Sequence, residues 1–208
     1  FFRKSAIQTL DTDPIDVAVT TTKVSILKAA VPFNDTLMLF SDQTQFQLAK
    51  AELLTPKTIG INPTTEFSCN TLATPVNAGN NVYFAQSRGG YSGLREYYVD
   101  PVTAINDATD VTSHCPTYIP GNIRKMAAST NENTIVCLSD VQRDTVYVYR
   151  YYWSQQTKLQ SSWSKWVMTP GSEVLDLAFL NSTLVLVISR PDGCYIETMD
   201  LTSGVTDT

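Results

Sequence analysis

Histidine is nearly absent from this 208-residue sequence: His114 is its only copy, and the chain has four cysteines. Any Ser-His-Asp arrangement or histidine-containing metal site would therefore have to use His114. Cys69, Cys115, Cys137 and Cys194 show none of the close spacings that mark zinc sites. We expect all four to be free thiols without a disulfide framework, which fits a reducing place of assembly.

Other absences exclude further classes of protein. The longest apolar run, Leu184 to Ile188, is far shorter than the roughly 20 residues of a transmembrane helix, so no membrane span is predicted. The net charge of −5 and the lack of a basic cluster argue against a surface that grips phosphates. A glycine-rich phosphate loop is also missing, so nucleotide hydrolysis is unsupported and we predict no cofactor.

The sequence does contain an internal repeat. Each copy has a turn rich in Asn, then an apolar strand, then Ser followed by a charged residue. Steps of 47, 52 and 48 residues separate the turn asparagines, a period typical of one small antiparallel sheet per unit. The four stretches are Asn34 to Asp42, Asn80 to Arg88, Asn133 to Asp140, and Asn181 to Arg190.

Each unit also supplies a second strand in which polar and apolar residues alternate, as in Gln45 to Leu48 and Val146 to Tyr149. Alternation marks a half-buried strand, whereas the continuous apolar run before it marks a strand buried on both faces. The pattern predicts an all-β fold: a β-propeller-like array of about four antiparallel blades, part of a larger propeller. The expected single segment is 1–208, with approximate units 20–68, 69–103, 118–168 and 172–208.

Turn chemistry supports the same architecture. Asn and Asp tolerate positive φ and bond their own backbone, while Gly89-Gly90 and Pro191-Asp192-Gly193 are expected to close hairpins. One short connector helix is predicted near 106–114, where Asp107 or Asp110 would be the N-cap and Pro116 the stop.

Several strings go beyond a generic propeller. Asp13-Pro14-Ile15-Asp16-Val17-Ala18-Val19 resembles the middle of the tail tubular protein B family, the nozzle proteins of short-tailed phages of the T-seven type. A second collinear string combines Asp110, His114, Pro116, Tyr118 and Pro120, and a third contains Trp163 and Trp166. The similarity covers nearly the whole chain and is weaker between Thr55 and Asn80 and after Gly171.

This resemblance implies a virion structural protein rather than an enzyme. The family forms a hexameric ring below the tail adaptor, with tail fibres as further neighbours, and double-stranded DNA passes through that tube without tight binding. Family members are several times longer, so this chain is expected to be a central fragment. The implied location is the phage tail, after assembly in the cytoplasm of the bacterial host.

Two pairs of residues invite a chemical interpretation. Asp110 and His114 lie one helical turn apart and could be two metal ligands, but no third ligand is evident. Asp13 and Asp16 could be the paired carboxylates of a glycosidase. A loop that enters a strand at Ile15 explains their spacing better, so no catalytic or metal residue is predicted.

Aromatic residues gather in the third unit, and the four most notable are Tyr149, Tyr151, Trp163 and Trp166. Packing between adjacent blades is the expected role, and a protein–protein contact is the alternative. Exposed aromatics also stack sugars, so the alternative function is a propeller module that degrades envelope polysaccharide or binds glycans. That alternative rests on fold analogy alone.

Overall fold

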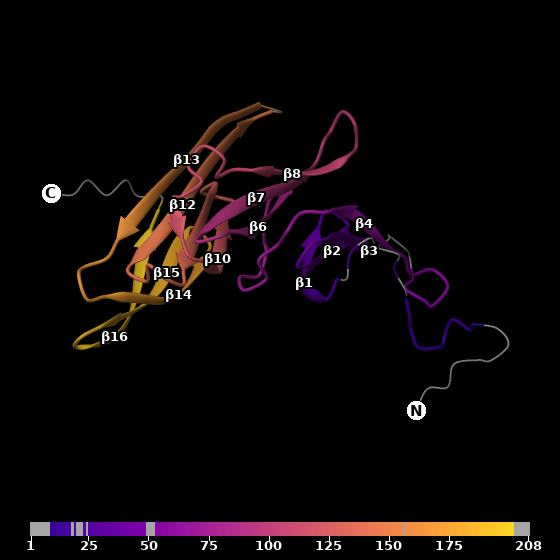
Figure 1. Ribbon diagram of the computed structural model, residues 1–208, viewed down its shortest axis with the longest axis horizontal. Coiled ribbons are helices and arrows are strands. Elements are labelled where there is room, and N and C mark those ends of the chain that lie inside the picture. The colour runs from indigo at the N-terminus through magenta and orange to yellow at the C-terminus, as the bar shows by residue number, and fades with distance from the viewer. Residues whose placement is uncertain are drawn as a thin grey trace.

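The computed structural model describes residues 9–17, 19, 23, 25–48, 53–155 and 157–201. Within these ranges all regular structure is β-strand: sixteen strands pair in antiparallel fashion and form four sheets. The all-β prediction is therefore confirmed. Figure 1 shows the four sheets following one another along the long axis of the molecule, in chain order from the N-terminal side.

Each sheet consists of strands that are consecutive in the sequence. Sheet 1 has the order β1 (Leu27–Phe33), β2 (Thr36–Ser41), β3 (Gln45–Leu48), β4 (Ile61–Thr65). Sheet 2 has the order β5 (Val76–Ala78), β6 (Asn81–Arg88), β7 (Tyr91–Val99), β8 (Asn106–Asp110), and the short β9 (Ile119–Pro120) also pairs with β7.

The last two sheets follow the same rule. Sheet 3 has the order β10 (Ile123–Ser129), β11 (Thr134–Ser139), β12 (Thr145–Ser154), β13 (Thr157–Val167). Sheet 4 has three strands: β14 (Glu173–Leu180), β15 (Thr183–Arg190), β16 (Gly193–Asp200). Adjacent strands joined by short turns explain this order, because such hairpins cost little chain entropy.

The predicted turns occur where the repeat places them, with one change. Asn34, Asn133 and Asn181 adopt φ of 52°, 47° and 55°, the left-handed conformation that Asn tolerates. In the second unit Gly79, with φ of 67°, takes this role instead of an asparagine. Gly89 and Gly90 connect β6 to β7, as expected.

The predicted connector helix at 106–114 is wrong. Residues 106–110 form β8, which pairs with β7, and residues 111–114 form a turn. In β8 the Ala108 side chain is buried while Asp107 and Thr109 are exposed, so the segment has the two-residue period of a strand. Pairing with β7 outweighs the weak helix signal, since tertiary context overrides local propensity.

The middle strands of sheets 2 and 3, β6 and β11, are buried on both faces because a sheet packs against each side. In β6, Val82 and Phe84 join the cluster shared with sheet 1, whereas Tyr83 and Ala85 join the cluster shared with sheet 3. All six residues of β11 are buried for the same reason. The continuous apolar runs thus predicted double burial correctly for β6 and β11, but not for β2 and β15, where alternate residues are only half-buried.

The first strands of the sheets lie next to one another. β1 contacts β5, β5 contacts β10, and β10 contacts β14. The first strands of successive sheets thus lie side by side. The β12–β13 hairpin (residues 145–167) extends beyond the rest of sheet 3 (Figure 1).

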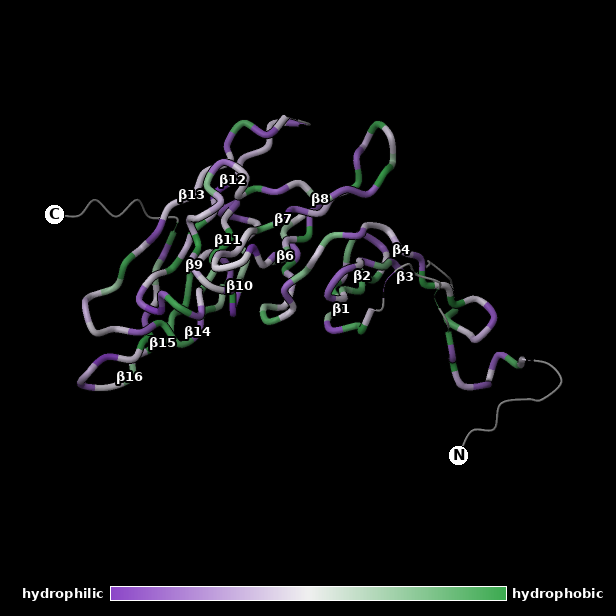
Figure 2. The backbone as a smooth tube through the Cα atoms, viewed as in Figure 1, coloured by the Kyte–Doolittle hydropathy of each residue, from purple (hydrophilic) through white to green (hydrophobic). Residues whose placement is uncertain are grey.

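Sheet 4 leaves one face without a neighbouring sheet among the described residues. Leu184, Leu186 and Ile188 face sheet 3, whereas the alternate residues Val185 and Val187 point the other way and are half-buried. Ile196 is paired with Val187 and is 75% exposed. Figure 2 shows the hydrophobic stretches of β14 and β15. The outward face of sheet 4 therefore carries apolar residues, with Thr198 beside Val185.

No helix in the described part of the chain has both the length and the apolarity of a membrane span. All four cysteines lie within the described ranges and are free thiols, as the sequence indicated.

We expect the thiols to differ sharply in reactivity. Cys194 is exposed, whereas Cys69 and Cys137 are buried. Burial, assisted by the charge of Asp42, raises the pKa of Cys69 to about 12, and burial also raises the pKa of Cys137. Because the thiolate is the nucleophile, a thiol reagent at pH 8 should modify Cys194 at least about a hundredfold faster than Cys69 or Cys137.

Mass spectrometry of peptides sampled over time measures these rates. In guanidinium chloride all four cysteines should react at similar rates, which serves as the control. Equal rates for Cys194 and Cys137 in the native protein would contradict the described core.

Candidate functional site

The aromatic residues of the third unit meet at the interface between sheets 2 and 3. Tyr149 is fully buried and Tyr151 is 7% exposed. Tyr151 stacks on Tyr83 of sheet 2 at a centroid distance of 5.8 Å, and Trp163 lies 5.1 Å from Tyr149. Trp166 points to the other side and packs against the cluster shared by sheets 3 and 4. These side chains join neighbouring sheets.

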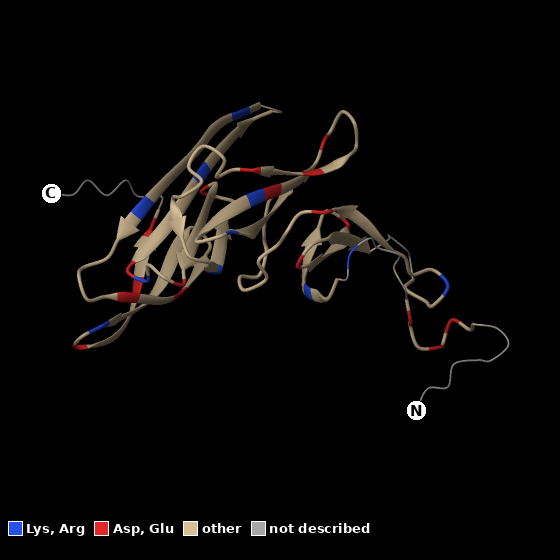
Figure 3. Ribbon diagram, viewed as in Figure 1, with Lys and Arg blue, Asp and Glu red and all other residues tan. Residues whose placement is uncertain are grey.

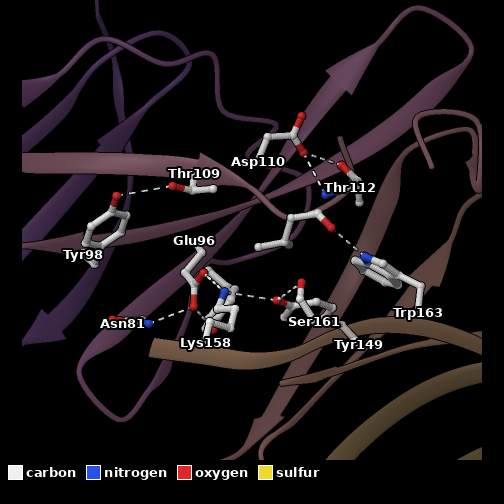
Figure 4. A network of polar contacts seen from close by, with 12 residues as sticks. Asn81, Glu96, Tyr98, Thr109, Asp110, Thr112, Tyr149, Lys158, Ser161 and Trp163 are labelled. Atoms are coloured by element: carbon white, nitrogen blue, oxygen red, sulfur yellow. Dashed lines mark hydrogen bonds and ion pairs between the residues drawn. The ribbon is translucent and has the colours of Figure 1, made fainter. Parts of the chain in front are cut away.

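A buried ion pair crosses the same interface. Glu96 of β7 is 2% exposed, and its carboxylate pairs with the ammonium of Lys158 on β13 (Figure 4). Tyr83 donates its hydroxyl to Glu96, and Asn81 donates its side-chain amide at 2.8 Å. Burial and the nearby charge of Glu96 raise the pKa of Tyr83, so this hydroxyl remains a donor. The carboxylate is thus fully satisfied despite its burial.

Lys158 also fixes the β12–β13 hairpin. Its ammonium lies 4.9 Å from the ring centroid of Trp153 and 3.2 Å from the hydroxyl of Tyr149. Tyr149 in turn shares a hydrogen bond of 2.9 Å with Ser161 (Figure 4). The cation–π contact and these hydrogen bonds join the two strands of the hairpin, and the ion pair with Glu96 holds it against sheet 2.

The segment after β8 is held by polar contacts. Asp110 forms an ion pair with Arg88 and accepts hydrogen bonds from the backbone N–H and hydroxyl of Thr112. The indole N–H of Trp163 then donates to the carbonyl of Val111 at 2.9 Å (Figure 4). Asp110 therefore stabilises a turn that is also hydrogen-bonded to sheet 3 through Trp163.

A second polar junction lies where β9 leads into β10. The Ser92 hydroxyl donates to the carbonyl of Gly121 and accepts from the backbone N–H of Ile123. Asp140 accepts from the backbone N–H of Asn122 at 2.7 Å and from its side-chain amide at 3.0 Å. Gly121 has φ of 69°, and a Cβ there would lie 2.2 Å from the Oδ1 of Asp140. Only glycine fits this close approach.

Asp140 should make the stability of this chain depend on pH. Burial alone would raise the pKa of its carboxyl, but the hydrogen bonds from Asn122 and the charge of Arg124 lower it overall. A pKa lowered by folding stabilises the native state above the unfolded value of about 3.9, and this contribution disappears as pH falls below it. Asp140→Asn should therefore cost about 1 kcal/mol at pH 7 and clearly less at pH 3, which lies below the unfolded pKa.

Urea unfolding at both pH values measures this difference. Asp192→Asn, at an exposed turn where Asp192 accepts from the Tyr195 hydroxyl, provides the control. A loss for Asp140→Asn that is equal at pH 7 and pH 3 would contradict the role of the charge.

Sheets 3 and 4 are joined by charged groups at the edge of an aliphatic core. The Arg124 guanidinium donates to the carbonyls of Val174 and Leu175 on β14. Lys125 also reaches Asp176 at 3.0 Å. Each interface between neighbouring sheets in this half of the molecule thus combines a dry core with polar contacts.

The remaining motif residues are dispersed. Tyr118 is half-buried and its ring lies 5.7 Å from that of Tyr147, while Pro120 pairs with Tyr91 as part of β9. His114 and Pro116 are exposed. Because residues 111–114 form a turn, the helical spacing proposed for Asp110 and His114 does not exist.

The strand expected from Ile15 is not present. Residues 14–17 have no regular structure and Ile15 is 48% exposed. Asp13 accepts a hydrogen bond from the backbone N–H of Leu10, which closes a turn before Pro14, and Asp16 follows in the exposed stretch. Ala18, in the same string, lies outside the described residues. Pro14 favours an extended backbone at the residue before it. An extended segment becomes a strand only when it pairs with another strand.

Among the residues that the structure describes, no three His, Cys, Asp or Glu side chains come together as metal ligands would. The polar groups described above at the interfaces of sheets 2, 3 and 4 are instead satisfied by one another. These contacts hold neighbouring sheets in fixed positions relative to one another, so they suit a mechanical role.

Sequence reasoning missed Glu96 and Lys158. They are 62 positions apart, so no local pattern connects them. The available signal was that Glu96 has the same parity as Leu94 in a half-buried strand, which places a carboxylate on the apolar face.

Comparison with known proteins gives two findings. The family described as "Bacteriophage nozzle protein" matches residues 1–208. The chain is also 33% identical over 208 residues to the tail tubular protein gp12 of Escherichia phage T7, and the alignment covers 100% of this chain and 26% of that protein. The chain thus spans about a quarter of the length of the curated relative that it matches.

Proposed function

This chain belongs to the bacteriophage nozzle protein family, and from that premise we propose that it is a structural segment of a phage tail. Its role is to form part of the wall of the tube through which double-stranded DNA leaves the virion. The observation that carries this proposal is the family match over the whole chain. The four sheets, locked by dry cores and polar contacts, suit a rigid wall.

We propose that the sheets are blades of a β-propeller larger than this segment, with units near 20–68, 69–103, 118–168 and 172–208. Two observations support it. The first strands of successive sheets lie side by side, as they do around a propeller axis. The outward face of sheet 4, with Val185, Val187 and Ile196, is apolar in the way that a face covered by another blade would be.

The proposed partners are further copies of the same protein in a hexameric ring, the tail adaptor and tail fibres. Assembly takes place in the bacterial cytoplasm and the product resides in the virion. An acidic balance of −5 suits a conduit, because repulsion of phosphates allows DNA to slide without being held. We propose no catalytic activity and no bound cofactor.

The alternative of a glycan-degrading or glycan-binding module has no supporting observation. Tyr149 and Tyr151, which would have formed part of a sugar platform, lie in the core. Asp13 and Asp16 lie in a stretch where Pro14 and Ile15 are exposed and irregular, rather than at the two sides of a cleft.

Cryo-electron microscopy of the full-length protein mixed with its tail adaptor tests the proposed function. We expect a ring in which the four sheets form part of the wall around a central channel. A protein that remains a monomer and never joins the adaptor would overturn the proposal.

A further inference from the structure

The projecting β12–β13 hairpin differs in charge from the rest of the chain. Residues 145–168 contain Arg150, Lys158 and Lys165 but no acidic residue, so all 20 acidic residues lie elsewhere. Figure 3 shows blue without red along the projecting part of this hairpin. An acidic protein thus presents one basic arm.

The arm also exposes large apolar side chains. Tyr152 is 50% exposed, Trp153 is 38% exposed and Leu159 is 63% exposed, and all three belong to the end of the hairpin, where Tyr152 pairs with Gln160 and Trp153 with Lys158. Soluble proteins seldom leave such a group uncovered without a binding role. Tyrosine, tryptophan and arginine are also the residues that most often anchor protein–protein interfaces.

The arm is held in place before any partner arrives. Lys158 ties it to buried Glu96, and the indole of Trp163 ties its base to Val111. A preformed arm loses little conformational entropy on binding, so more of its contact energy appears as affinity.

We propose that this arm docks on a second copy of the same protein, between neighbouring subunits of the ring. The inference rests on the proposed function for the expectation that copies meet. Charge complementarity selects the occupant, because the arm is basic and the surface of every other copy carries the acidic residues. Among the described residues β13 is the edge strand of sheet 3, so its outer backbone groups are available to such a contact.

DNA is the competing occupant, and the arm fits it poorly. Lys158 is neutralised by Glu96, which leaves Arg150 and Lys165 as the exposed cations of the arm. Tight binding to DNA draws on many phosphate contacts, of the order of six to ten in well-studied proteins. Exposed Leu159 contributes to a protein interface but not to phosphate binding.

The test uses the full-length protein with a photo-crosslinking amino acid in place of Tyr152. Illumination of the assembled ring should join two copies of the protein through this position. The same amino acid at Val102, which is 84% exposed on the loop between β7 and β8, is the matched control and should give at least about tenfold less crosslinked dimer. Crosslinking of Tyr152 to the adaptor or to DNA, or no crosslink in an assembled ring, would overturn the proposal.

A charge variant gives an independent measurement. Arg150→Glu combined with Lys165→Glu should weaken self-association at least about tenfold in sedimentation experiments, whereas Lys28→Glu on β1 should leave it unchanged. Unchanged far-UV circular dichroism establishes that the variants fold. If the double variant forms an unaltered ring, the docking role of the arm is wrong but the proposed function stands. If the wild-type protein never self-associates, the proposed function itself is wrong.

Discussion

Lys158→Met is expected to lower the free energy of unfolding of this chain by about 3 kcal/mol. The change leaves the Glu96 carboxylate, which is 2% exposed, without its counter-charge, and only the Tyr83 hydroxyl and the Asn81 amide remain as donors. An unpaired buried charge is far more costly than a missing ion pair. Urea unfolding followed by circular dichroism measures the loss.

Two further variants make this result interpretable. Glu96→Gln combined with Lys158→Met removes both charges and should recover most of the loss, because no buried charge remains. Lys125→Met is the matched control: its partner Asp176 has 55% of its side chain exposed, so water screens that pair and the cost should stay below about 1 kcal/mol. A loss at Lys158 no larger than that at Lys125 would contradict a buried pair.

Gly121→Ala is the second change with a large expected effect, again about 3 kcal/mol, which for a chain of this size is a fall in Tm of roughly 6 to 12 °C. The new Cβ would meet Oδ1 of Asp140 at 2.2 Å and Cγ2 of Val141 at 2.5 Å. Relief of this clash moves Asp140 away from the N–H of Asn122, so the junction between sheets 2 and 3 loses hydrogen bonds in addition to backbone strain.

Gly79→Ala separates these two causes. Gly79 has nearly the same φ, 67°, but it lies on an exposed turn where a Cβ would have nothing within 4 Å. The substitution should cost only the backbone term of about 1 kcal/mol. Thermal denaturation of both variants in parallel decides the point, and equal falls in Tm would show that the contact with Asp140 is unimportant.

Much of the strand pattern could be predicted from the sequence because the forces involved are local or periodic. The apolar run from Leu184 to Ile188 predicted β15, and the glycine pair after Arg88 predicted a hairpin that the structure contains. Asn34 and Asn181 take the left-handed conformation that their turn position indicated. Each of these features depends on residues a few positions apart.

Features that depend on pairing could not be predicted in the same way. Residues Asn106 to Asp110 form the strand β8 because they pair with the edge of β7. Nothing in the sequence of this segment indicates that β7 lies beside it. β4 contains Pro63, which suits an outer strand but masks a strand pattern. The Glu96–Lys158 pair likewise exists only after sheets 2 and 3 meet.

Strand order within the sheets has a consequence for synthesis. Every strand pairing except β7 with β9 joins strands that are consecutive in the chain, so each sheet can form on the ribosome as soon as its own residues emerge. Its second face, however, stays exposed to water until the following sheet has formed. Val136 and Leu138, for example, are buried only once β14 and β15 pack against them. During synthesis, the sheet completed last therefore always exposes one hydrophobic face. A nascent chain should be most prone to aggregate when translation pauses between two sheets.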